Sequence, residues 1–74
     1  MNKDNKVKQI LREYLKIKEQ CKIYIVWKYK VLQYTKWLLS VNNLCYEITY
    51  NKHKNELYVN DNINKYCINN PFKK

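Results

Sequence analysis

The chain has 74 residues, enough for a single small domain with a modest core. It contains no glycine, which excludes the glycine-rich phosphate loops, dinucleotide fingerprints and nucleophile elbows of many enzyme classes. Fifteen Lys and Arg residues against six Asp and Glu give a formal net charge of +9, so we expect an anionic partner.

The composition also indicates the kind of genome that encodes the protein and the part of the chain that carries the positive charge. Lys, Asn, Ile and Tyr are abundant while Ala and Gly are absent, a bias that follows AT-rich codons and is typical of small phage or mobile-element proteins. This bias does not explain the shortage of acidic residues, so the charge remains informative. Residues 1–37 hold ten basic and three acidic side chains, against five and three in residues 38–74. We therefore expect residues 1–37 to contact the anionic partner.

Cysteine usage and hydropathy predict a cytoplasmic protein. Cys21, Cys45 and Cys67 form an odd set without a CxxC pair, and the first ten residues lack the apolar core of a signal peptide. The longest uncharged run has ten residues, 37–46, whereas a membrane span needs about 20 apolar residues. We therefore expect reduced thiols and no transmembrane segment.

The most regular pattern lies near the N-terminus. From residue 4 to residue 20, apolar side chains repeat at spacings of three and four, which predicts an amphipathic helix. Lys8, Arg12 and Lys16 lie on its opposite side, so this helix joins a core face to a basic face.

The next segment is ambiguous. Residues 22–30 fit a strand, with Ile23, Ile25, Trp27 and Tyr29 on one face and lysines on the other, and they also fit a helical spacing. A short strand or irregular segment is the preferred interpretation. Residues 31–42 then predict a second helix, with Asn43 as a left-handed stop in a chain without glycine.

The C-terminal half predicts a hairpin followed by a short helix. Residues 44–51 and 56–60 are rich in β-forming side chains and flank a polar, basic tip. Asn60 or Asp61 is expected to cap a last helix that carries Ile63, Tyr66 and Cys67 and ends before Pro71.

These elements predict a single α+β domain over residues 1–74. Its order of N-terminal helix, ambiguous segment, second helix, β-hairpin and short C-terminal helix is that of a winged helix-turn-helix, an analogy of element order alone. A mostly helical fold is the alternative.

Lysines interleaved with Tyr and Trp predict a nucleic-acid interface, because phosphates attract cations and exposed bases stack on aromatic rings. The competing interpretation is a solvated lysine face around an aromatic core. A single Arg limits bidentate base reading, which favours backbone contacts. The candidate residues are Lys8, Arg12, Lys16, Lys22, Lys28, Lys30, Lys36, Lys52 and Lys54.

Metal and enzyme chemistry are poorly supported. Three cysteines and His53 form a chemical Cys₃His set, but zinc sites are usually built on close pairs that this chain lacks. A cysteine nucleophile with His53 as base has no orienting group or oxyanion hole signalled in the sequence. We expect no cofactor and no enzymatic activity.

Two functions therefore compete. The first is a non-enzymatic nucleic-acid-binding regulator or accessory protein, acting on DNA or RNA. The second is a protein-binding inhibitor, anti-CRISPR-like or anti-restriction, that blocks a protein or nucleoprotein target; an exposed Trp27 or Trp37 would favour it. Either one is compatible with a homodimer, since the core is small.

Overall fold

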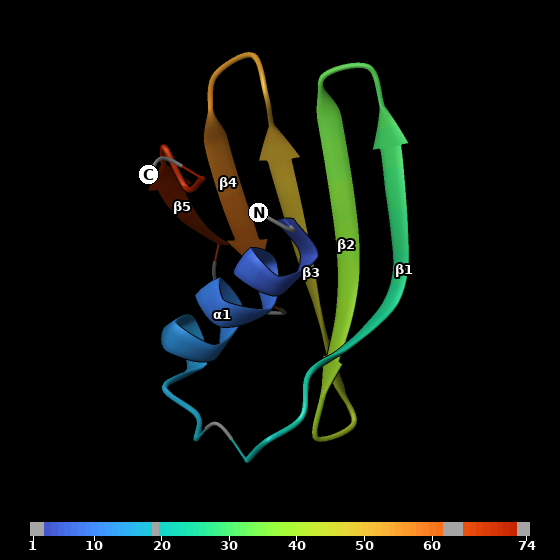
Figure 1. Ribbon diagram of the computed structural model, residues 1–74, viewed down its shortest axis with the longest axis vertical. Helices are drawn as coiled ribbons and strands as arrows, with labels where there is room; N and C mark the ends of the chain where they lie inside the picture. The colour runs from blue at the N-terminus through green and yellow to red at the C-terminus, as the bar shows by residue number, and fades with distance from the viewer. Residues whose placement is uncertain (1–2, 19, 62–64, 73–74) are drawn as a thin grey trace.

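The fold is a helix packed on one face of a five-stranded antiparallel sheet, seen in a computed structural model that describes residues 3–18, 20–61 and 65–72 (Figure 1). The sheet follows the order of the chain, β1-β2-β3-β4-β5. The elements are α1 (Lys3–Leu15), β1 (Tyr24–Val31), β2 (Tyr34–Val41), β3 (Leu44–Asn51), β4 (Glu56–Asn60) and β5 (Lys65–Asn69). No helix in the described residues has the length and apolar character that a bilayer crossing requires.

The strand interpretation of residues 22–30 and the hairpin of β3 and β4 are confirmed. The N-terminal helix is also present, but it ends at Leu15 and not at residue 20 as predicted. The predicted layout as a whole is wrong, because the second helix, the C-terminal helix, the winged-helix order and the mostly helical alternative are all replaced by sheet.

Most of residues 31–42 form strand β2 and not a helix, because the buried side chains alternate instead of following a helical stripe. Thr35, Trp37, Leu39 and Val41 are buried, and the residues between them are only partly covered. This period of two is that of a strand with one face in the core. The segment therefore pairs with β1 on one side and β3 on the other.

The turns on either side of β2 take left-handed backbone without glycine. Leu32, in the two-residue β1–β2 turn, has φ 51°, and Asn42 and Asn43, in the β2–β3 turn, have φ 50° and 66°. Two consecutive positive φ values are the geometry of a type I′ hairpin turn. Asn43 has the predicted left-handed backbone, but it reverses a strand where a helix end was expected.

The last strand stands where the short C-terminal helix was predicted. Residues 65–69 pair with β4, from Asn60 opposite Lys65 to Glu56 opposite Asn69. The Ile63 position expected in that helix lies outside the described residues.

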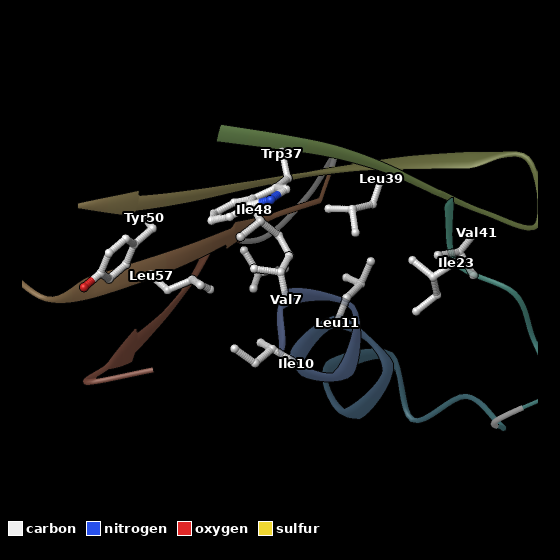
Figure 2. Packing of buried hydrophobic residues seen from close by; sticks show 11 residues of the cluster. Val7, Ile10, Leu11, Ile23, Trp37, Leu39, Val41, Ile48, Tyr50 and Leu57 are labelled. Carbon is white, nitrogen blue, oxygen red and sulfur yellow. The ribbon is translucent and has the colours of Figure 1, made fainter. Parts of the chain in front are cut away.

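The core lies between α1 and the sheet (Figure 2). The helix supplies three buried side chains, Val7, Ile10 and Leu11. Those facing it come from the residue just before β1 and from β2, β3 and β4: Ile23, Trp37, Leu39, Val41, Ile48, Tyr50, Leu57 and Val59. With the only described helix on this side, the opposite face of the sheet, which we call the open face, has no layer packed against it.

Candidate nucleic-acid interface

Two basic stretches of the chain meet at Asp4, in the first turn of α1. Lys28 Nζ lies 3.1 Å from Asp4 Oδ1, and Trp37 Nε1 donates a hydrogen bond of 2.9 Å to the same oxygen. Lys28 pairs with Trp37 across β1 and β2, so its side chain lies on the face that α1 covers. Lys8 follows Asp4 by one helical turn and therefore lies on the same side of α1.

The carboxyl of Asp4 is ionised and neutralises part of this charge. The hydrogen bond from Trp37 is the main reason that its pKa lies below the usual value, and Lys28 and Lys8 act in the same direction against the effect of burial. One carboxylate thus lies under the influence of two lysines, which leaves a positive surplus.

Further lysines extend this positive surface along the edge of the sheet. Lys30 pairs with buried Thr35 and therefore points to the same side as Lys28, and its side chain is exposed. Lys22, also exposed, lies just before β1. We call Lys8, Lys22, Lys28 and Lys30 the basic edge.

Arg12 links α1 to the segment that precedes β1. Its Nη1 donates to the backbone oxygens of Lys18 and Cys21, both at 2.7 Å, which ties the segment before β1 to α1. Arg12 lies one turn beyond Lys8, so these bonds hold the backbone just before Lys22 against α1. The sequence placed Arg12 among the phosphate contacts, whereas the structure gives it a positioning role.

The other predicted residues lie elsewhere. Lys16 lines a groove of about 510 Å³ between α1 and β5, together with Lys6. Lys36 points to the open face, because it pairs with Tyr29 and alternates with the buried residues of β2. Lys52 and Lys54 lie in the β3–β4 turn, at the end of the sheet that also holds the β1–β2 turn (Figure 1). The nine predicted cations do not form one patch.

The open face carries the aromatic residues that the sequence associated with the lysines. Two rows of side chains run across it in register. One row is Tyr29, Lys36, Thr49, Tyr58 and Cys67, and the next is Trp27, Leu38, Glu47, Asn60 and Lys65. Trp27, Tyr29, Val31, Tyr34 and Lys36 surround a hollow of about 450 Å³.

A β-bulge decides where Trp27 points. The register of β1 shifts between Ile25 and Trp27, so Ile25 packs toward the core while Trp27 lies on the open face, 42% exposed. Strict alternation predicted the two side chains on one face, and that expectation is wrong. Trp37, by contrast, is completely buried. Nothing in the apolar pattern marks Val26 as the extra residue.

Tyr58 is tied to its own neighbours on the open face. Its hydroxyl donates to Glu56 Oε1 at 2.5 Å, and this bond, with burial as a smaller cause, raises the pKa of Tyr58 to about 12. Lys65 Nζ lies 5.1 Å from the centroid of the Tyr58 ring.

The metal and nucleophile candidates are not brought together. Among the described residues, no three His, Cys, Asp or Glu side chains form a group that could hold a metal ion. Cys45 lies near the start of β3 and His53 beyond its end. Six strand positions, about 20 Å, separate Cys45 from Asn51.

Comparison with known proteins gives a family and no activity. The chain belongs to a family of unknown function, DUF6275, whose match covers residues 2–68. No curated protein and no solved structure matches it significantly.

Proposed function

We propose that this member of the DUF6275 family is a non-enzymatic nucleic-acid-binding protein whose basic edge holds the phosphate backbone. The observation that carries the proposal is the ion pair of Lys28 from β1 with Asp4, one helical turn before Lys8 on α1, with Lys30 exposed on the same side of the sheet and Lys22 exposed just before β1. Four lysines along one edge suit a chain of phosphates, which attracts flexible ammonium groups.

Binding through the backbone implies weak sequence preference. Arg12, the only arginine, donates to backbone oxygens of its own chain and is not free to read a base edge. Lysine contacts to phosphate orient a protein on nucleic acid without reading its sequence. A small cytoplasmic regulator or accessory protein of a phage or mobile element fits this behaviour.

Salt dependence tests the proposal directly. Four neutralised phosphates give a slope of log K against log salt of about −3.6 on duplex DNA. Fluorescence anisotropy with a labelled duplex, a single strand and an RNA of equal length, each at several salt concentrations, measures the slope and ranks the three ligands. Absence of binding at low salt, or binding that does not change with salt, would contradict the proposal.

Two substitutions on α1 provide a matched comparison. Lys8→Gln removes a basic-edge cation, whereas Lys6→Gln removes a cation that lines the α1–β5 groove. We expect Lys8→Gln to reduce the salt slope by about 0.9, the value of one phosphate contact, while Lys6→Gln leaves the slope unchanged. Equal slopes for the two variants would mean that general charge, rather than the basic edge, attracts the nucleic acid.

A protein-binding inhibitor is the second candidate function, and the exposure of Trp27 favours it. If it is correct, a target protein stays bound to the immobilised chain after nuclease treatment and high-salt washing, and Trp27→Ala releases it. Loss of the target on nuclease treatment would instead support the nucleic-acid proposal.

A further inference from the structure

The open face is more apolar than solvent-facing sheet normally is. Tyr29, Tyr34, Trp27 and Val31 are 59%, 43%, 42% and 39% exposed and adjoin on β1 and β2, and Leu38 is half-buried in the next row. Antiparallel sheets with one solvated face usually carry polar residues there. Large exposed apolar patches on small proteins usually mark an interaction surface.

The charges on the open face balance, so this face does not favour the polyanion that we propose for the basic edge. Lys36 and Lys65 are balanced by Glu47 and Glu56, which the strand register places on the same face. The chain as a whole carries +9. Because the open face is neutral, it neither attracts a polyanion nor repels an identical face.

The size of the open face also suits a partner of the same kind. Five strands spaced about 4.8 Å apart and five to eight residues long give a flat footprint of about 550 Å², before side-chain relief is added. Specific protein interfaces bury about 800 Å² of accessible surface on each partner. Two open faces in contact therefore approach the area of a stable interface.

We infer that the open face binds the open face of a second copy of this chain, which forms a two-layer sheet dimer with α1 on both outer sides. Lys36 and Glu47 lie on adjacent strands, one row apart. A two-fold axis between the two sheets that passes midway between these residues places Lys36 of each copy opposite Glu47 of the other. Trp27 and Tyr29 then leave water, and both basic edges remain accessible.

Charge reversal tests this arrangement. Light scattering coupled to size exclusion, over about 1 to 200 µM protein, should give a mass rising toward twice the 9.2 kDa of one chain. Lys36→Glu and Glu47→Lys should each raise the dimer dissociation constant about tenfold or more, because like charges then face each other. The double variant Lys36→Glu/Glu47→Lys should restore the dimer.

Lys30→Glu is the matched control, because it changes the net charge as Lys36→Glu does but lies on the other side of β1. It should leave the dimer intact while weakening nucleic-acid binding, so failure of one proposal is distinguishable from failure of the other. Acrylamide quenching of tryptophan fluorescence is an independent measurement. Trp37 is buried in the monomer and in the dimer, so a decrease in quenching as the protein concentration rises reports the burial of Trp27.

Three results would overturn the dimer. They are a mass of one chain at every concentration, single reversals without effect, and a double variant that stays monomeric although circular dichroism shows it folded. A chain that remains single but holds a foreign protein through Trp27 would assign the open face to that protein instead.

Discussion

Trp37 donates its indole N–H to the carboxylate of Asp4 at 2.9 Å, which joins the middle of β2 to the first turn of α1. Trp37 is the largest fully buried side chain, so its polar N–H needs an acceptor inside the protein. The acceptor sits at the end of α1 where a negative charge also favours the helix dipole. One carboxylate thus accepts the buried N–H of Trp37, interacts favourably with the dipole of α1 and forms an ion pair with Lys28 at the basic edge.

Removing the acceptor should destabilise the fold more than removing the charge. Asp4→Ala leaves the Trp37 N–H buried without a partner, at a cost of about 1–3 kcal/mol in the free energy of unfolding. Asp4→Asn keeps an oxygen for Trp37 and loses only the half-exposed ion pair with Lys28, at a cost below about 1 kcal/mol. Urea unfolding followed by tryptophan fluorescence compares them, and equal losses would mean that the ion pair is the larger contribution.

The same carboxylate makes stability depend on acidity. The pKa of Asp4 is lowered from 3.8, first by the bond from Trp37, so the unfolded chain binds the proton more tightly than the folded chain. The contribution is complete above the unfolded-state value and is lost as pH falls through the lower folded-state value. The difference in unfolding free energy between wild type and Asp4→Asn should therefore be largest at neutral pH and shrink below pH 3.8. A constant difference would rule out the lowered pKa.

Residues 31–42 show why half of the fold could not be predicted. Apolar residues are so dense in this segment that helical spacing and alternation both fit, and the turns that decide between them carry no glycine. The pair Asn42 and Asn43 was the usable signal, since two residues with left-handed tolerance between alternating segments indicate a hairpin. Leu32 gave no such signal, because bulky side chains rarely occupy that backbone region.

Leu32 is consequently a site where stability can be gained. Its φ of 51° places an L-residue in left-handed backbone, which costs about 1–2 kcal/mol, and its side chain is 86% exposed and has little packing to lose. Leu32→Gly should raise the unfolding free energy by about 1 kcal/mol, measured by chemical denaturation. The neighbouring Gln33→Gly serves as the control, because Gln33 has no positive φ and glycine there should destabilise the chain. A gain in both variants would exclude backbone strain as the reason.

The two faces of β2 should respond differently to the same truncation. Leu39 is completely buried beneath α1, and Leu39→Ala should cost about 2–5 kcal/mol, enough to unfold much of a marginal small domain. Leu38→Ala, on the open face, should cost much less at protein concentrations where the chain is monomeric. Circular dichroism melts of the two variants decide between these outcomes. Comparable losses would mean that the open face is part of a core.

The candidate site was predicted in part. Lys28 and Lys30 do share the side of the sheet that α1 covers, and Lys8 lies one helical turn after Asp4, the partner of Lys28; the excess of lysines in the first half of the chain was visible in the sequence. The separation of Lys36 from them follows from β-pairing, which reverses the direction of alternate side chains and cannot be seen while the segment is taken as a helix. The use of Arg12 as an internal donor depends on tertiary contacts with residues six and nine positions away.

Tyr58 should be among the last of the eight tyrosines to ionise. Its bond to Glu56 stabilises the protonated hydroxyl and raises the pKa to about 12, so this contribution to stability is present below pH 10 and is lost as pH rises toward 12. Glu56→Gln should return the pKa toward 10, measured by NMR titration of ¹³C-labelled tyrosine. Tyr14, which donates to Asp61 and also has a raised pKa, is the internal control and should not respond. An equal fall at both residues would point to a global loosening of the fold instead of the loss of one hydrogen bond.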